Sequence, residues 1–260
     1  MAGMAAYLQN QLRSHLFRTA SFAKPGALYI ALFVGGVEVS GGGYQRVNLP
    51  PGDANWSAEA TDGQTKNLVD VVFGSPTTLW GQVNEFAIFD ALTAGNMLFG
   101  RTAITPKNVN AGDGPPSFPA GWITIDVDTA GVLGAYLQNQ LRAHIFRTGS
   151  FAKPAVLAIA LYAGAAEVSG GNYARIALNP GDANWSAEVT DGQTKNSATI
   201  TFNPPTATWG APVDNMAIFD ALAGGNLLFG PKPLLNPKNI GNGDPGPQFD
   251  VGTLSIDFDI

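Results

Sequence analysis

The chain contains two histidines, His15 and His144, which occupy equivalent positions in two near-identical stretches of sequence. An imidazole could act there as a metal ligand or as a general base. Neither histidine has a second histidine in its own half of the chain or an acidic residue in its own expected helix, so the other members of such a site are missing. The pattern favours residues at the boundary of an apolar stripe that make local hydrogen bonds.

Paired aspartates are the second group that could do chemistry. Two carboxylates that lie two residues apart on a strand point to the same side, as a hard cation such as calcium would require. The candidates are Asp126, Asp128, Asp257 and Asp259 on expected strands, and Asp53, Asp62, Asp182 and Asp191 in loops that could join them only if the fold brought them near. The spacing matches no EF-hand or nonapeptide calcium repeat. It favours a solvated strand face and turn-forming aspartates, and we predict no metal and no cofactor.

Other catalytic motifs are absent or incomplete. The chain has no cysteine, which excludes disulfides, thiolate catalysis and cysteine zinc sites. Residues 241–246, GNGDPG, formally match the dinucleotide-binding pattern, but no helix is expected to follow them and hold a pyrophosphate. No nucleophile and base pair is evident either. We therefore predict that the chain is not an enzyme.

Charge and composition limit the remaining classes. The formal net charge is −6, and the 14 basic residues form no run or stripe, which argues against nucleic-acid binding. No signal peptide and no apolar stretch of the ~20 residues that span a bilayer can be recognised, so we expect synthesis in a cytoplasm and no membrane insertion. Hydrophobic residues make up 45% and charged residues 13% of the chain, with 32 glycines and 18 prolines. This profile is typical of an all-β protein with many turns.

The chain is a tandem duplication. Tyr7 and Tyr136 begin the same heptapeptide, YLQNQLR, and lie 129 positions apart. The offset grows by one residue at each of two later points, both beside proline, where loops tolerate insertions. The period far exceeds that of a solenoid. We predict two domains, 1–130 and 131–260, with a boundary near Thr129–Val132.

Each copy is expected to begin with one short helix and to continue as strands. Leu8, Leu12, Leu16 and Phe17 form one apolar stripe at helical spacing, and Pro25 limits the helix. Residues 27–33, ALYIALF, read as a strand buried on both faces. In WITIDVD, residues 122–128, the isoleucines and valine should face the core and the aspartates the solvent. The fold class is mainly all-β: two tandem, jelly-roll-like β-sandwiches, each preceded by one short N-terminal helix.

Four stretches of each copy together resemble a family of small bacteriophage virion proteins, the tail fibre and minor structural proteins. These stretches are residues 28–33, 38–46, 80–91 and 96–100, and again 157–162, 167–175, 209–221 and 226–230. They match the family's LY-x-ALF strand, TEVSGGGYAR hairpin, WG-x-V-x-x-F-x-x-FDA segment and GGNLLF turn. The resemblance covers nearly the whole chain, and the duplication departs from the single copy of most members. It implies a place on a virus particle and no catalytic residues.

The resemblance and the residues lead to one functional hypothesis with two alternatives. We expect a non-enzymatic structural component of a phage virion, a tail fibre, tail-tip or baseplate protein that contributes to tail assembly or host attachment. The alternatives are a capsid-decorating (cement) protein of the phage head and a carbohydrate-binding adhesion module. The expected partners are other virion proteins, further copies of the chain, with a trimer favoured because phage tails join threefold and sixfold elements, and a host-surface glycan.

The polar loop at residues 51–67 returns at 180–196 with one residue changed, whereas the strand-like segment after it has drifted. Sandwich cores accept many apolar combinations, so the constant loop suggests a contact with a partner. Recent duplication or gene conversion would also explain it. The candidate contact residues are Asp53, Asn55, Trp56, Asp62, Lys66, Asp182, Asn184, Trp185, Asp191 and Lys195. We expect Trp56 and Trp185 to be exposed, so that their replacement by alanine weakens assembly or adhesion with little change in thermal stability.

Overall fold

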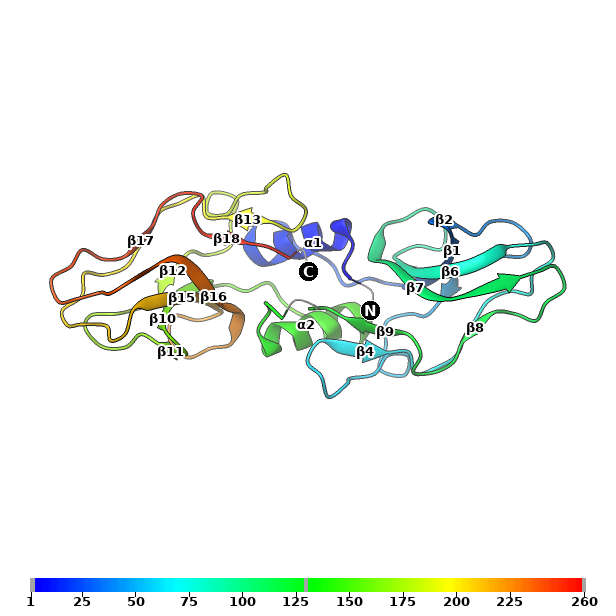
Figure 1. Cartoon of the computed structure of the whole chain (residues 1–260), viewed down its shortest axis with the longest axis horizontal. Helices are drawn as coiled ribbons and strands as arrows, with labels where there is room; N and C mark the ends of the chain where they lie inside the picture. The colour runs from blue at the N-terminus through cyan, green and yellow to red at the C-terminus, as the bar shows by residue number, and fades with distance from the viewer. Residues whose placement is uncertain (1–2, 129–130, 259–260) are drawn as a thin grey trace.

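A computed structural model describes residues 3–128 and 131–258 of the chain. The molecule is elongated: two β lobes lie at opposite ends and two helices lie between them (Figure 1). The first repeat contains α1 (Ala6–Phe17), β1 (Tyr29–Val34), β2 (Val37–Glu38), β3 (Val47–Asn48), β4 (Gln64–Lys66), β5 (Val71–Val72), β6 (Gly81–Phe89), β7 (Met97–Val109), β8 (Ser117–Phe118) and β9 (Thr124–Asp126). The second contains α2 (Ala135–Phe146), β10 (Ala158–Ala163), β11 (Ala166–Glu167), β12 (Ile176–Ala177), β13 (Thr194–Lys195), β14 (Ile200–Thr201), β15 (Val213–Phe219), β16 (Leu227–Lys238), β17 (Gln248–Phe249) and β18 (Ser255–Ile256). We call the strands of the first repeat lobe 1 and those of the second lobe 2.

Each lobe has two layers. In lobe 1 the first layer is an antiparallel five-stranded sheet in the order β2-β1-β6-β7, with β3 also paired to β1. The second layer is an antiparallel ribbon in which β4 pairs with β9 and β5 with β8. Lobe 2 repeats this topology with β10–β18. The layers meet at aromatic contacts such as Phe86 of β6 against Phe118 of β8, whose ring centroids are 5.6 Å apart.

Strand β1 is buried on both faces, as its continuous apolar sequence predicts. Ile30 and Leu32 belong to the core between the layers, and Ala31 and Phe33 to a small cluster on the other face of the sheet. The Arg46 guanidinium lies 3.7 Å from the ring centroid of Phe89 and covers that cluster. This pattern explains why the strand contains no charged residue.

The helices form as their apolar stripes predict, since Leu8, Leu12, Leu16 and Phe17 are completely buried. Helix α1 ends at Phe17, well before Pro25. The prediction of two tandem, mainly β domains, each with one N-terminal helix, is confirmed. Of the expected boundary, Thr129 and Ala130 lie outside the described residues. The division at residue 130 stays a prediction, and one hydrophobic core runs through both repeats.

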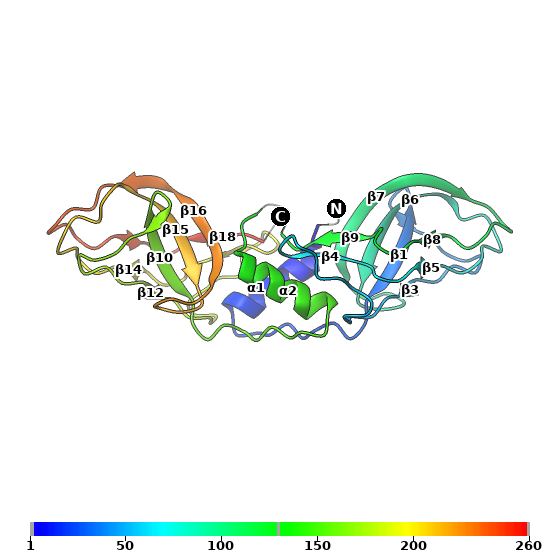
Figure 2. The ribbon, with the colours of Figure 1, turned by 90° about the horizontal axis from the view of Figure 1, so that it is seen from below.

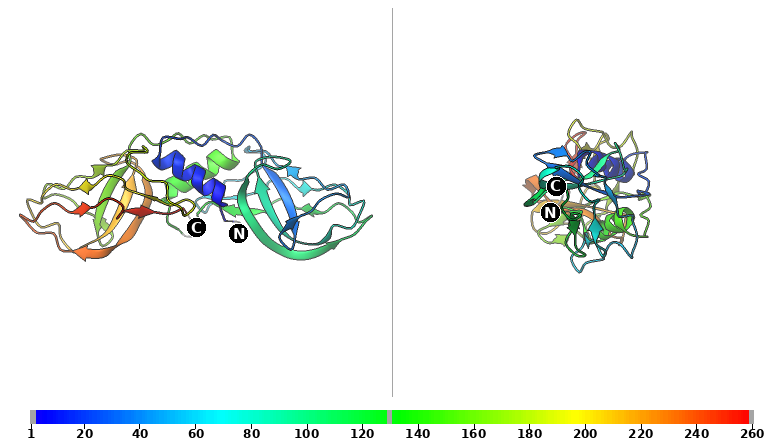
Figure 3. Two further views of the ribbon diagram at one scale, coloured as in Figure 1. Left: turned by 90° about the horizontal axis from the view of Figure 1, so that it is seen from above. Right: turned by 90° about the vertical axis from the view of Figure 1, so that its right-hand side faces the viewer.

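Each helix spans the gap between the lobes. Helix α1 starts beside its own lobe, where Met4 bridges to Phe99 of β7 and the Ala5 N–H donates to the Leu98 carbonyl. It ends against lobe 2, and the chain then returns along the waist of the molecule to β1, as Figures 2 and 3 show. Helix α2 makes the reciprocal path from lobe 2 to lobe 1. The two helices therefore exchange lobes.

Candidate functional site

The two near-identical polar loops contact the ends of the exchanged helices. We call residues 51–67 and 180–196 the helix-binding loops; they differ only at Ala60 and Val189. In the first loop the Gly52 N–H donates to the Phe146 carbonyl at the end of α2, with 2.9 Å between nitrogen and oxygen. The Phe146 ring lies 4.8 Å from the Trp56 ring and 5.1 Å from the Phe99 ring, centroid to centroid. The end of α2 is therefore part of the core of lobe 1.

The same contacts recur in the opposite direction. The Gly181 N–H donates to the Phe17 carbonyl at 2.8 Å, and the Phe17 ring lies 4.7 Å from Trp185 and 5.2 Å from Phe229. When a patch on one unit binds the partner's equivalent patch reciprocally, the two units are related by a twofold axis. The duplicated chain therefore has the architecture of a twofold dimer made as one polypeptide, with the axis between the helices.

A charged contact closes each helix end. Arg147 lies 3.0 Å from Asp53, measured from Nε to Oδ1, and its Nη1 donates to the Trp56 carbonyl at 2.9 Å. The Thr148 hydroxyl and N–H both donate to the same carboxylate. These hydrogen bonds, and then the Arg147 charge, lower the pKa of Asp53. Arg18, Thr19 and Asp182 make the equivalent set.

A second contact lies at the tip of each loop. The Asn139 side chain donates to Asp62 at 2.7 Å and accepts from the Gly63 N–H at 3.3 Å, while Asn10 does the same with Asp191 and Gly192. Gly63 has a φ of +72°, and a Cβ there would lie 2.9 Å from a Val127 methyl and 3.1 Å from Gln138 Cβ. The loop therefore requires glycine both for its backbone conformation and for its close approach to α2.

Lysines from the other repeat bind the helix C-termini. The Lys24 ammonium donates to the carbonyls of Arg147 and Gly149, and Lys153 donates to those of Arg18 and Ala20. The last carbonyls of a helix lack partners within it and carry its partial negative charge. A cation from the opposite repeat therefore stabilises each exchanged end.

The two histidines meet at the centre of the molecule. Their rings stack with centroids 5.8 Å apart, and both side chains are buried. The Nδ1 atoms of His15 and His144 accept the N–H groups of Phe22 and Phe151 at 3.1 Å, which are the local hydrogen bonds expected from the sequence. Burial, followed by the neighbouring His144, lowers the pKa of His15 to about 4, and burial lowers that of His144. Both imidazoles are therefore neutral at pH 7 and act as packing residues.

The predicted exposure of Trp56 and Trp185 is wrong, since both side chains are completely buried. Their polar neighbours in sequence suggested a surface position, but the fold places a phenylalanine of the other repeat over each indole. The indole N–H groups donate to the carbonyls of Leu49 and Leu178. The expectation that alanine at these positions leaves thermal stability nearly unchanged fails with the premise of exposure.

The other predicted contact residues divide into two groups. Asp53, Asp62, Asp182 and Asp191 contact the exchanged helices, as described above. The side chains of Asn55 and Asn184 donate to Pro50 and Asn179 within their own repeat, and Lys66 and Lys195 pair with Glu59 and Glu188 at 3.2 Å. The second group shapes the loop and leaves the first to bind the helix. Contacts of these loops with other proteins stay a prediction.

The expected solvent exposure of the paired aspartates is wrong for Asp126 and Asp128, which are buried, although Ile123, Ile125 and Val127 face the core as predicted. The Asp128 carboxylate accepts the N–H groups of Val132 and Leu133 and the side-chain amide of Gln138. The chain entering α2 thus covers the strand face that alternation assigned to solvent.

Asp257 interacts with Gln193 at 3.2 Å, and Asp259 lies outside the described residues. Across residues 3–128 and 131–258, no group of three histidine, aspartate or glutamate side chains could hold a metal ion. No helix in the same ranges is long and apolar enough to cross a membrane.

The sequence did not lead us to predict that the two helices bind these loops. Residues 6–17 and 135–146 differ only at two positions, Ser14/Ala143 and Leu16/Ile145, so the helices are nearly as constant as the loops they bind. Each copy thus has two nearly constant segments, the helix and the polar loop. This shared constancy was the signal in the sequence that the helix binds the loop. Reasoning also missed the Glu38–Arg46 pair, whose atoms lie 2.8 Å apart and which supports the cation over Phe89.

Comparison with known proteins gives one family. A family model described as Podophage GP4 fiber I protein gp80 matches residues 3–126 and again residues 133–257. No match to the chain was found among curated proteins. The two matched regions coincide with the two repeats and together include the helices, the helix-binding loops and both lobes.

Proposed function

The chain belongs to the family of podophage GP4 fibre I proteins, a family of phage structural fibre proteins, and on this premise we propose that it is a non-enzymatic component of the tail fibre or tail tip. In this role it is a two-ended connector that contributes to tail assembly or host attachment. The virion is its place of action, after synthesis in the bacterial cytoplasm.

The reciprocal helix exchange is the observation that carries this proposal. Each helix is anchored by a bridge to its own lobe at one end and by aromatic, charged and backbone contacts to the other lobe at its far end. Two lobes that share one core resist bending at the waist more than two domains joined by a single linker. A stiff body with similar ends that point in opposite directions suits a part that joins other fibre subunits.

A trimer of this chain is part of the proposal. Its internal pseudo-twofold arrangement supplies two similar lobes per chain, so a homotrimer presents six lobes around one threefold axis. That number matches the threefold and sixfold elements that meet in phage tails. Light scattering on the purified chain should give three times the chain mass of 27.1 kDa; a species of any other stoichiometry would contradict the trimer alone.

Immunogold electron microscopy of intact particles tests the placement. Antibody raised against the recombinant chain should place gold at the tail fibres or the tail tip. Gold distributed over the head would instead support the capsid-decorating alternative, and particles without any label would contradict a role in the virion.

A further inference from the structure

The outer edge of β7 in lobe 1 is partly used and partly open. At its start, the segment before α1 pairs with it: the Gly100 N–H donates to the Gly3 carbonyl at 2.8 Å, and the Ala5 N–H to the Leu98 carbonyl at 2.9 Å. From residue 101 to 108, the described part of the chain provides no backbone partner other than β6. The edge therefore already accepts one extended segment at its start, and Arg101, Ala103 and Thr105 further along it are exposed.

The equivalent edge in lobe 2 is blocked by prolines. Strand β16 has Pro231 and Pro233 where β7 has Arg101 and Ala103, and Pro237 where β7 has Pro106. Proline has no N–H to donate to an added strand. Lobe 1 thus offers an unblocked stretch at residues 101–105, and lobe 2 does not.

The strand register shows in which direction the backbone N–H groups of residues 101–105 point. Asn215 is paired with Pro233, and because proline cannot donate, that pair cannot exchange ladder hydrogen bonds. The peptide nitrogen of residue 233 therefore faces away from β15. Glu85 and Ala103 pair at the same position in lobe 1, so the N–H of Ala103 faces the outer edge and is available to an incoming strand.

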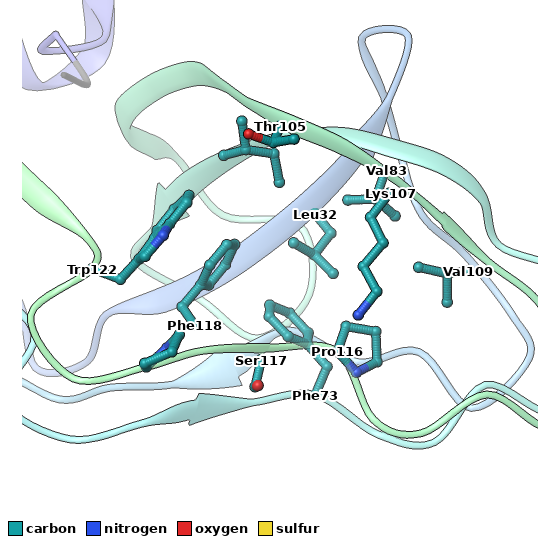
Figure 4. A pocket seen from close by; sticks show the side chains of 12 residues that line it. Leu32, Phe73, Val83, Thr105, Lys107, Val109, Pro116, Ser117, Phe118 and Trp122 are labelled. Carbon is teal, nitrogen blue, oxygen red and sulfur yellow. The ribbon is translucent and has the colours of Figure 1, made fainter.

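An apolar pocket of about 170 Å³ opens between this edge and the ribbon. Figure 4 shows Leu32 at its floor, Phe118 and Trp122 along one side, and the Lys107 side chain on the other. Trp122 is 47% exposed although its ring stacks on Phe118 at 4.8 Å. In lobe 2 the residue equivalent to Trp122 is Thr253. The pocket and the open edge thus occur together in lobe 1.

We propose that the outer edge of β7 at residues 101–105 binds an extended segment of another virion protein by strand addition. Main-chain hydrogen bonds to an edge strand supply affinity in this mode, and pockets beside the edge select side chains. The segment places one bulky apolar side chain in the pocket against Trp122, and an acidic side chain beside Lys107, which forms no ion pair with a described residue. Its identity as a virion protein rests on the proposed function, whereas the strand addition itself rests on the edge and the pocket.

Photo-crosslinking in assembled particles tests this proposal. Benzoylphenylalanine in place of the exposed Thr105 should link the chain to one segment of a different virion protein, identified by mass spectrometry of the linked peptides. The same residue in place of Asn236, the equivalent position in lobe 2, is the matched control and should give at least tenfold less product. A link from residue 105 only to a second copy of this chain, or none, would overturn the proposal. Absence of the chain from the particles would instead contradict the proposed function.

Two substitutions taken from lobe 2 sharpen the test. Ala103→Pro copies Pro233, and Trp122→Thr copies Thr253, so the fold already accommodates both side chains at these positions. Each should reduce crosslinking from residue 105 at least tenfold, with less than 3 °C change in the melting temperature of the free chain as the criterion of an intact fold. Crosslinking by Ala103→Pro at the level of the unsubstituted chain would show that the edge is not the binding site.

Discussion

We call the two helices and the helix-binding loops the waist of the molecule, and the free sides of β7 and β16 its outer edges. The sequences of the two repeats agree closely at the waist and differ at the outer edges. At the waist, each helix and the loop that binds it are almost the same in both copies, and the polar contacts of Asn10 and Asn139 and of Arg18 and Arg147 with the loops occur in equivalent pairs. At the edges, β7 and β16 differ in prolines, and Trp122 corresponds to Thr253. A substitution at the waist must suit a helix from the other repeat, whereas Arg101, Ala103 and Trp122 at the outer edge are exposed. The constant segments therefore coincide with the internal junction, and these differences lie on the exposed edges.

The largest expected loss of stability comes from removing a phenylalanine ring that packs on a tryptophan at the waist. Phe146→Ala and Phe17→Ala should each lower the free energy of unfolding by about 3–5 kcal/mol, because each removes a completely buried ring and leaves a cavity beside a tryptophan. Denaturant unfolding measures both. Leu235→Ala, at a side chain that is 98% exposed on an outer edge, is the control and should change stability by less than about 0.5 kcal/mol. Equal losses of unfolding free energy in the phenylalanine variants and in Leu235→Ala would show that the waist is no more important for stability than the edge.

Mild acid should lower the free energy of unfolding through the buried histidine pair at the waist. The pKa of His15 is about 4 in the folded chain and near its ordinary value of 6.5 in the unfolded chain, so the unfolded chain takes up the proton first. Stability is therefore complete above pH 6.5 and falls as the pH drops towards 4, by about 3 kcal/mol for this residue. His144 acts in the same direction, and the groups facing the pair, Lys24 and Lys153, are cations that oppose protonation.

Unfolding free energies measured between pH 7 and 4.5 isolate this effect. The carboxylates with lowered pKa values contribute stability that is lost only as the pH falls through their ordinary range and below; they are Asp53, Asp182, Glu59, Glu188 and Glu167. His15→Gln should make the curve flatter in this window. A curve that is already flat for the unsubstituted chain would show that the histidines do not titrate as their burial requires.

The close approach of the first helix-binding loop to α2 predicts a smaller loss of stability when a methyl group is added at Gly63. Gly63→Ala adds a methyl group that meets Val127 and Gln138, in addition to the cost of a positive φ. Gly112→Ala is the matched control, since Gly112 also has a positive φ, +83°, but nothing lies within 4 Å of an added Cβ. Thermal or denaturant unfolding should show that the substitution at Gly63 costs about 1–2 kcal/mol more than the control. Equal costs would mean that the loop has room beside α2 and that only its backbone conformation requires glycine.

Much of the fold could be predicted from the sequence, but the exchange could not. The apolar stripe of α1 specifies which face is buried, and the run in β1 specifies burial on both faces. Neither pattern specifies which lobe covers the helix, because the helices and loops of the two repeats are nearly identical and either loop fits either helix. The expected exposure of Trp56 is wrong because the ring that covers it, Phe146, lies far away in sequence. Alternation likewise assigned Asp128 to solvent, since it contains no information about a chain that returns over the strand.

The smallest expected effect concerns the one residue that differs between the helix-binding loops. Val189 is fully exposed and Ala60 is exposed, so neither side chain is packed in the core. Ala60→Val and Val189→Ala should therefore change the free energy of unfolding by less than about 0.5 kcal/mol.

If the loops are constant because of the helices they bind, substitutions should be tolerated at this position and costly at Gly63. If recent duplication alone explains the constancy, other exposed loop positions that contact the helix, such as Asp62, should tolerate change equally well. Asp62→Ala therefore belongs in the same unfolding series, and a loss of about 1 kcal/mol beside a neutral Ala60→Val would attribute the constancy to the contact with Asn139.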